Sequence, residues 1–272
     1  MVNRELTTDH QPLTSDYSRI NMTITRSIAV VSQKGGVGKT SLVQNLGAEL
    51  VNAGKRVLLI DFDPQSNLTI GWGLDPNTER PTIYQAMLKP LHAVSYVVGL
   101  RENLDIIPAN LDLAGAELAF INAIDRNNKL RKVLQHLPGY DFILIDGPPS
   151  LGFFTVNALA ATSEVLIPLQ VQAYAYKALD QLLAIIEQVQ EVNPELVLSG
   201  FVLTMYDRRN ALTATVEELA RRRFGKKVFQ TVIPVNVRIA EAPLDGTSVG
   251  DYDAKSKGAI AYVQLAQEVL TP

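Results

Sequence analysis

The sequence predicts one α/β domain in which helices cover both faces of a mostly parallel, twisted sheet. Short runs of valine, isoleucine and leucine alternate with longer helical stretches, an order typical of parallel strands joined by right-handed crossovers. The apolar runs are nearly continuous, as expected of strands that are covered on both faces. A glycine-rich turn directly follows the first run and opens the first helical stretch.

Three helical stretches and seven apolar runs make up the predicted order of elements. The first helix, 39–54, is amphipathic and ends at Gly54, a suitable C-cap. The second, 176–192, stops before Pro194, and a third begins near Ala211. The predicted strands are 27–32, 56–63, 104–109, 141–149, 164–170, 196–206 and 227–234.

Composition and the two ends of the chain limit the remaining possibilities. Residues 1–25 are polar and lack sustained periodicity, so we expect a flexible tail before a single domain at 26–272. The 272 residues include no cysteine, which excludes disulfides, thiolate metal sites and iron–sulfur clusters. No apolar run is long enough to span a membrane and no secretory signal is present, so we expect a cytoplasmic protein.

The first loop carries the chemistry of nucleotide binding. In IAVVSQKGGVGKTS (28–41) a strand runs into a glycine-rich turn and then a helix, which is the context of a P-loop. Backbone N–H groups and the helix N-terminus would hold phosphate, Lys39 would reach the β- and γ-phosphates, and the Thr40 hydroxyl would bind Mg²⁺. The sequence therefore predicts a P-loop NTPase whose nucleotide contacts within this loop are Gly35, Gly36, Val37, Gly38, Lys39, Thr40 and Ser41.

This loop departs from the ordinary P-loop pattern in one informative way. Gln33 stands where the leading glycine belongs, and Lys34 follows it. The resulting K-G-G-x-G-K-[ST] form is similar to the deviant loop of the ParA/MinD group of ATPases, and the chain resembles ParA/Soj partition proteins over about 27–270. The resemblance implies ATP and Mg²⁺ as cofactors and a homodimer in the ATP-bound state. It also implies that Lys34 reaches the phosphates bound by the partner subunit.

Three aspartates follow predicted strands. Asp61 and Asp63 end one apolar run and Asp146 ends another, and open parallel sheets bind ligands at the carboxyl ends of their strands. Asp146 matches the aspartate that holds Mg²⁺ through its water shell. By resemblance, Asp61 does similar outer-sphere work, and Asp63 orients or deprotonates the attacking water, so that Lys34, Lys39 and Asp63 form the catalytic set.

The resemblance also assigns two switch segments and a base-binding region. DPQSN (63–67) and GPPSLG (147–152) would sense the γ-phosphate and report it to the dimer interface. The family commonly has cysteine at the position of Gly147. Relatives form the adenine pocket from strand ends such as TMYD (204–207) and IPVN (233–236), which suggests Met205 and Pro234.

Basic residues gather in the C-terminal part although the net charge is −3. Residues 208–238 contain eight basic and two acidic side chains, which leaves the rest of the chain strongly acidic. Cations at a helix C-terminus also favour its dipole and often form only a solvated face. The resemblance favours sequence-independent DNA binding, although Val235 replaces an arginine of the family's IPRNVRLSEAP. The candidate DNA contacts are Arg208, Arg209, Arg221, Arg222, Arg223, Lys226, Lys227, Arg238, Lys255 and Lys257.

Together these features predict a slow, switch-like ATPase for DNA partition, associated with the nucleoid. The resemblance implies that a ParB-like (Spo0J-like) centromere-binding protein would stimulate hydrolysis and release the dimer from DNA. A membrane-bound ATPase of the MinD kind needs a C-terminal basic amphipathic helix, which GAIAYVQLAQEVLTP does not supply. A synthetase or reductase on the same fold is a further alternative, and the reductase branch needs cysteines. The cargo (chromosome, plasmid or protein organelle) stays open.

Overall fold

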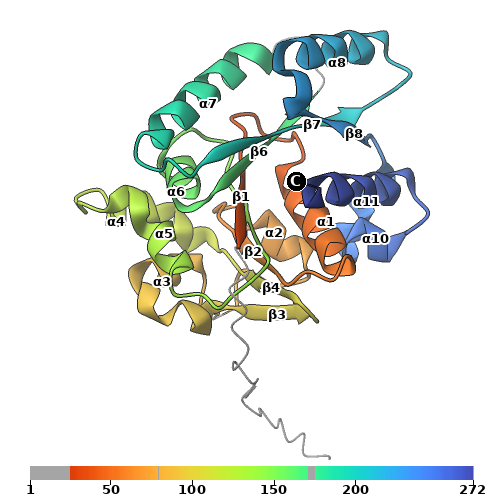
Figure 1. Cartoon of the computed structure of the whole chain (residues 1–272). Coiled ribbons are helices and arrows are strands. Elements are labelled where there is room, and N and C mark those ends of the chain that lie inside the picture. The colour runs from red at the N-terminus through yellow and green to blue at the C-terminus, as the bar shows by residue number, and fades with distance from the viewer. Residues whose placement is uncertain (1–24, 79, 171–174, 272) are drawn as a thin grey trace, which may run out of the picture.

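The computed structural model describes residues 25–78, 80–170 and 175–271, so most of the predicted tail at 1–25 lies outside the described residues. One eight-stranded sheet runs through the centre, with helices packed on both sides (Figure 1). The strand order is β3-β4-β2-β5-β1-β6-β7-β8. The predicted fold class is therefore confirmed.

All strand pairs of this sheet are parallel except β3 with β4. The seven predicted strands all form, most of them shortened at one or both ends. The strand β3 was not predicted, because it is a half-exposed edge strand of four residues without an apolar run. It turns into β4 at Asn103, whose φ is 61°. The strands are β1 (Arg26–Val30), β2 (Val57–Asp61), β3 (Val98–Arg101), β4 (Leu104–Ile107), β5 (Phe142–Asp146), β6 (Glu164–Gln170), β7 (Val197–Tyr206) and β8 (Val228–Pro234).

The helices divide into two layers because neighbouring residues of a strand point to opposite faces. In β1, Ala29 packs into one core cluster, whereas Ile28 and Val30 pack into the other. The first cluster lies under α5–α8 and the second under α1, α10 and α11. The α-helices are α1 (Lys39–Asn52), α2 (Asn67–Gly71), α3 (Ile83–Leu88), α4 (Ala116–Ala119), α5 (Lys129–Leu134), α6 (Phe153–Ala161), α7 (Ala175–Gln190), α8 (Ala211–Phe224), α9 (Val237–Glu241), α10 (Val249–Tyr252) and α11 (Lys257–Leu270).

Short 3₁₀ helices link several of these elements: η1 (Pro90–Tyr96), η2 (Leu111–Gly115), η3 (Arg126–Asn128), η4 (Gly225–Lys227) and η5 (Ala242–Asp245). The long predicted helices form close to their predicted bounds, and the helix expected near Ala211 begins at that residue. Within the described ranges, no helix combines the length and apolar character needed to cross a bilayer.

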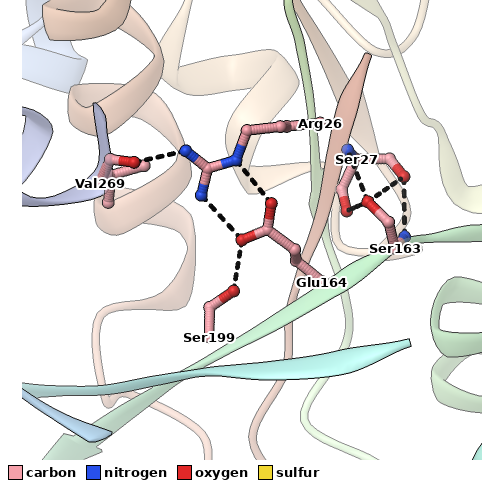
Figure 2. A network of polar contacts seen from close by, with 6 residues as sticks. All are labelled: Arg26, Ser27, Ser163, Glu164, Ser199 and Val269. Carbon is pink, nitrogen blue, oxygen red and sulfur yellow. Dashed lines mark hydrogen bonds and ion pairs between the residues drawn. The ribbon is translucent and has the colours of Figure 1, made fainter. Parts of the chain in front are cut away.

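A polar network ties together the amino ends of three strands (Figure 2). Arg26 at the start of β1 donates from Nε and Nη2 to Glu164 at the start of β6, at 2.6 and 2.8 Å. Ser199 of β7 donates its hydroxyl to the same carboxylate, and Arg26 Nη1 donates to the Val269 carbonyl of α11. Ser27 and Ser163 exchange further hydrogen bonds beside it. The polar side chains of this network at the amino ends of β1, β6 and β7 are therefore all hydrogen-bonded.

Candidate nucleotide-binding site

The loop between β1 and α1 has the backbone conformation of a phosphate-binding loop. Gly36 and Gly38 have φ of 71° and 88°, a region that residues with a Cβ rarely adopt. Gly38 immediately precedes α1, so the loop passes into the positive end of a 14-residue helix dipole. All the predicted nucleotide contacts from Lys34 to Ser41 lie in this loop or in the first turn of α1.

Lys39 lies at the base of the loop, where burial lowers its pKa. Its Nζ donates to the Lys34 carbonyl at 3.5 Å, a long contact that leaves the ammonium available to a stronger acceptor. The charges of Asp146 and Asp63 oppose the effect of burial and favour the protonated form. A buried, positively charged lysine at this place suits the phosphates of a nucleotide.

Asp146 ends β5 and is completely buried. Neither of its carboxylate oxygens accepts a hydrogen bond of normal geometry, although the Thr40 hydroxyl is near enough to oppose the shift in its pKa. Burial and the neighbouring charge of Asp61 raise that pKa well above its usual range. A buried carboxylate without a partner is costly, and a cation would satisfy it.

Asp61 ends the neighbouring strand β2 and is engaged on both oxygens. Its Oδ2 accepts from the backbone and the hydroxyl of Thr69, at 2.8 and 2.7 Å, and its Oδ1 accepts from the Asp63 N–H at 3.2 Å. Burial nevertheless raises its pKa to about 6. Thr69 was not among the predicted site residues, since nothing in the sequence spacing shows that α2 folds back onto β2.

The first switch segment, 63–67, turns directly beside this pair. Asp63 is nearly buried, and its Oδ1 accepts the Gln65 N–H at 3.0 Å. Ser66 at the end of the turn has φ of 57° and precedes α2. The three predicted aspartates therefore meet at the carboxyl ends of β2 and β5, next to the P-loop, because these two strands are neighbours in the sheet.

Lys34 occupies the exposed rim of the loop. Its Nζ donates to Oε1 of Gln170, the last residue of β6, at 2.7 Å. Its N–H donates to the Ser32 hydroxyl at 3.3 Å. Gln170 is a second contact that the sequence did not predict, because β6 lies beside β1 only in the folded sheet.

The predicted base-binding residues lie at adjoining strand ends. Pro234 of β8 is in register with Tyr206 of β7, one residue after Met205. Met205 has φ of 52° and an exposed side chain. Thr204 donates its hydroxyl to the Val37 carbonyl at 2.8 Å, so the end of β7 is attached to the P-loop. Met205 therefore follows directly on the residue that contacts the P-loop, whereas Pro234 lies one strand further out in the sheet.

The donor set at this edge fits Mg²⁺. Among the residues with a described structure, no group of three or more histidine, cysteine, aspartate or glutamate side chains could hold a metal alone. Mg²⁺ is commonly bound by one or two carboxylates together with substrate phosphates and water. The orphaned Asp146 carboxylate, the Thr40 hydroxyl and the phosphates of a bound nucleotide would supply such a set, with Asp61 beside it.

Gln44 of α1 connects the first switch region to the C-terminal segment. Its buried amide nitrogen donates to the Gly71 carbonyl at the end of α2 and to the Thr247 carbonyl, at 2.7 and 2.8 Å. The neighbouring Asn45 accepts from the Val249 N–H at 2.7 Å. Gln44 and Asn45 are polar residues within the buried face of α1. That break in the apolar pattern is the sequence signal from which their contacts could have been inferred.

The candidate DNA contacts do not form one surface. Arg208 and Arg209 follow β7, and Lys257 begins α11; all three line a groove of about 630 Å³ that also includes Pro234 and Val235. Arg238 and Lys255 lie in the same C-terminal segment, at the carboxyl edge of the sheet. This half of the set therefore lies at the same edge as the nucleotide loop.

The other cations lie at the amino edge, because α8 carries the chain back across the sheet. Lys227 precedes β8 and donates to the Leu198 carbonyl at the start of β7, at 2.7 Å. Many of the candidate DNA-contact cations form ion pairs with acidic residues of the same chain. The number of basic residues in the sequence therefore overstates the positive potential at their surfaces. The ion pairs are Arg209–Asp207, Arg221–Glu217, Arg222–Glu218, Arg223–Asp180 and Arg238 with Glu241 and Asp253.

Comparison with known proteins places this geometry in a family. A family model described as an AAA domain matches residues 25–198. The sporulation initiation inhibitor protein Soj of Bacillus subtilis is 44% identical over 89% of this chain and 97% of its own length. The chromosome-partitioning ATPase Soj of Thermus thermophilus is 44% identical over 90% of this chain and 95% of its own.

Solved structures agree with the fold and with the ligands expected at the site. A cobyrinic acid a,c-diamide synthase from Mycobacterium smegmatis, with a bound ATP analogue and magnesium, has a TM-score of 0.82 and 37% identity, over 91% of this chain and 94% of its own. The septum site-determining protein MinD of Pyrococcus horikoshii, complexed with Mg-ADP, has a TM-score of 0.73 and 30% identity, over 91% and 97%. The two Soj proteins match 89% and 90% of this chain, the family model also includes the P-loop, and the chain thus belongs to the Soj/ParA family of partition ATPases, within the ParA/MinD group of P-loop proteins.

Proposed function

We propose that the chain is an ATP-controlled DNA partition switch. In this proposal ATP drives the formation of a homodimer, the dimer binds DNA without sequence preference, and partner-stimulated hydrolysis releases it. Family membership supports partition ATPase activity. Dimerisation, DNA binding and stimulated release are proposed in addition to that activity.

The buried, unpartnered carboxylate of Asp146 beside the P-loop carries this proposal. Lys39, Thr40 and the N–H groups of the loop would bind the phosphates of a nucleotide and its Mg²⁺. Asp146 would hold that Mg²⁺ through its water shell. When bound, the metal supplies charge neutralisation on the β- and γ-phosphates. Asp61 would keep the first switch turn in register through its bonds to Thr69 and Asp63.

Asp63 and Lys34 are the proposed catalytic groups outside the metal site. Asp63 would orient the attacking water and accept its proton, and its place in the turn beside the P-loop supports this role. Lys34 would leave Gln170 and stabilise charge on the phosphates of the second subunit. Lys34 is exposed at the rim of the loop, which supports a contact with the phosphates bound by a second subunit better than a contact with those bound by its own.

The groove that contains Arg208, Arg209 and Lys257 is the proposed primary DNA contact. It lies at the carboxyl edge of the sheet, where the nucleotide binds, so a dimer joined at that edge would bring two copies to one duplex. Each added phosphate contact steepens the dependence of affinity on salt through counterion release. Gln44 donates hydrogen bonds both to α2 and to the segment at Thr247. A movement of the first switch segment could therefore shift the C-terminal segment and change the DNA-binding groove.

A ParB-like protein is the proposed stimulating partner, and the nucleoid within the cytoplasm is the proposed location. The names of the relatives favour chromosomal DNA as the cargo. Membrane attachment through the last helix is disfavoured, because α11 packs Tyr262, Leu265 and Val269 into the core against α1 and β8.

The test is retention on DNA of unrelated sequences with ATP and Mg²⁺ against ADP and Mg²⁺, at two salt concentrations. We expect binding with ATP that falls steeply with salt, and little binding with ADP. Lys257→Ala should weaken the ATP-dependent binding several-fold and lower the salt slope by about one phosphate contact. Lys226→Ala, an exposed lysine at the opposite edge, is the matched control. Equal retention in both nucleotide states would refute the switch.

An ATP-dependent synthetase is the second candidate, because one similar structure is that of a diamide synthase. Such an enzyme would hydrolyse ATP only with its metabolite and ammonia donor, and DNA would have no effect. Steady ATP turnover that rises with DNA and with a ParB-like protein would favour partition. Turnover that responds to an acidic metabolite and ignores DNA would favour the synthetase.

A further inference from the structure

A second cavity lies at the carboxyl edge of the sheet beyond β4. It has a volume of about 710 Å³ and is formed by the loop after α2, the helix α3 and the start of η2. Its wall includes Arg80, Leu88, Lys89, Asn110 and Leu111, and we call these five residues the α3 groove. None of them belongs to the P-loop, to a switch segment or to the candidate DNA contacts.

Two polar atoms of the α3 groove are buried without a partner. Arg80 Nη1 is a hydrogen-bond donor and Asn110 Oδ1 is an acceptor, and neither makes a hydrogen bond. The orientation of the Asn110 amide is fixed, because its Nδ2 donates to the Asp112 carboxylate at 3.0 Å and a carboxylate can only accept. Buried polar groups are rarely left unpaired, so this donor and this acceptor call for a ligand that offers the opposite pair.

A peptide group offers that pair, with a carbonyl for Arg80 and an N–H for Asn110. The groove also presents apolar surface, since Leu88 and Leu111 are 49% and 71% exposed. Among its described lining residues, the two cations Arg80 and Lys89 outnumber the single carboxylate of Asp112, which favours an acidic side chain placed beside Arg80 and Lys89. A free phosphate fits less well, because a fully ionised phosphate has no N–H to donate to the Asn110 oxygen.

The chain next to Asn110 is connected to the metal-binding edge by three hydrogen bonds. Ala109, next to Asn110, donates its N–H to the Thr69 hydroxyl oxygen at 3.0 Å. Thr69 in turn donates from its hydroxyl and its backbone N–H to Asp61. A ligand that moves the chain at Asn110 would therefore strain the group that positions the first switch turn.

We propose that the α3 groove binds an extended peptide segment of another protein, with an acidic side chain next to an apolar one, and that its occupancy alters the nucleotide site through Ala109, Thr69 and Asp61. The binding part stands on the groove alone. The effect on turnover rests on the proposed ATPase function. Leu88 and Leu111 receive the apolar side chain, and Lys89 with Arg80 receives the acidic one.

Disulfide tethering tests the binding part, because the chain has no cysteine of its own. Thr78→Cys places a single thiol at the wall of the groove, and Ser95→Cys, exposed on η1 and outside it, is the control. Each protein is equilibrated under reducing conditions with disulfide-capped Asp-Leu, Lys-Leu and Gly-Gly dipeptides and with a capped simple carboxylic acid. Mass spectrometry measures the fraction of protein captured by each.

We expect Asp-Leu to be captured at Thr78→Cys about tenfold more than Lys-Leu or the simple acid, with no preference at Ser95→Cys. Arg80→Gln and Asn110→Ala, each added to Thr78→Cys, should reduce the preference to about twofold or less. Equal capture of all probes, or the same preference at Ser95→Cys, overturns the proposal. Capture of the simple acid as well as Asp-Leu also overturns it, since no peptide group would then be recognised. Thermal unfolding checks that both double variants are folded.

ATP turnover of the tethered protein tests the coupling. Tethered Asp-Leu should change the rate at least twofold, and Thr69→Val, which removes the hydroxyl link, should abolish that change. Selective capture with an unchanged rate overturns the coupling. If the protein turns over no ATP under any condition, the proposed function fails, and the capture selectivities still decide whether the groove binds a peptide.

Discussion

The two ends of the central sheet treat a buried carboxylate in opposite ways. At the amino ends of the strands, Glu164 accepts hydrogen bonds from both Arg26 and Ser199 (Figure 2). At the carboxyl ends, Asp146 is fully buried and both of its oxygens lack a partner. The two residues lie on strands that flank β1, so the same sheet supports both environments.

The direction of each pKa shift records this difference. Burial alone would raise the pKa of Glu164, but the hydrogen bonds and charge of Arg26 and the Ser199 hydroxyl hold it below its usual range. Burial raises the pKa of Asp146, and the nearby Asp61 adds to the rise. The fold thus favours the charge of Glu164 and opposes that of Asp146.

The comparison teaches how to separate a carboxylate that supports the fold from one that serves a ligand. A partnered carboxylate contributes to stability, whereas an orphaned one lowers stability until a ligand satisfies it.

The largest effect is expected at Asp63, at the carboxyl end. Asp63→Ala should lower the rate of phosphate release by about 10²–10⁴-fold, because it removes the proposed group that orients and deprotonates water. Stabilisation by Mg²⁺ and ATP should remain, and the protein should stay on DNA. Asp245→Ala, an exposed aspartate in η5, is the control. An unchanged rate of phosphate release would reject the catalytic role of Asp63.

Glu164→Gln should have the largest effect on stability. It leaves Arg26 without a counter-charge at the amino end, and we expect the free energy of unfolding to fall by about 2–3 kcal/mol. Urea unfolding measures this change, and Glu195→Gln on the surface is the control. Nucleotide affinity of the folded fraction should not change. A loss of under about 0.5 kcal/mol would mean that the network in Figure 2 does not support the fold.

Asp146→Asn should act in the opposite sense. It removes a charge that the fold opposes, so the nucleotide-free protein should gain about 1 kcal/mol in the free energy of unfolding. The extra stabilisation that Mg²⁺ adds to bound ADP should disappear, as thermal unfolding with and without Mg²⁺ would show. A variant that is less stable without ligand and still responds to Mg²⁺ would contradict the assignment.

The pH dependence should separate the two ends as well. Asp61 has a raised pKa of about 6, so its contribution to folding is fully present below its unfolded pKa and is lost as pH rises through about 6. Mg²⁺ needs the ionised carboxylates, so its stabilising effect on bound ADP should decline as pH falls from 7.5 to 5. Glu164, with its lowered pKa, should lose its contribution only at more acidic pH. An effect of Mg²⁺ that is constant over this range would contradict the prediction.

The smallest effect is expected at the rim of the P-loop. Gln170→Ala removes one acceptor of Lys34 within its own subunit, so the ATP-dependent dimer should be favoured about twofold, in keeping with one exposed hydrogen bond of ~0.5 kcal/mol. Sedimentation with ATP measures the dimer, and Lys34→Ala should weaken it. Wild-type dimerisation of Lys34→Ala would end the cross-subunit account of this lysine.

Much of the fold and of the nucleotide site was predictable because its signals are local. A continuous apolar run predicts a buried strand, and glycines before a lysine and a threonine predict a phosphate loop. The missed strand β3 is short, half-exposed and without such a run, so it forms only because β4 offers an antiparallel edge. The contacts of Thr69 and Gln170 were also missed, because they join segments that are distant in sequence.

By itself, the sequence determined the fold class, the loop that receives phosphate, and the order in which Asp61, Asp63 and Asp146 follow their strands. Only the tertiary structure decided which carboxylates are satisfied and which cations share a surface. The strands β2, β5 and β1 are neighbours in the sheet. The helix α8 runs between Arg208 and Lys227, so Arg208 lies at the carboxyl edge and Lys227 at the amino edge. The reason is physical: periodicity and turn chemistry act over a few residues, whereas burial, pairing and electric field depend on neighbours that only the folded sheet supplies.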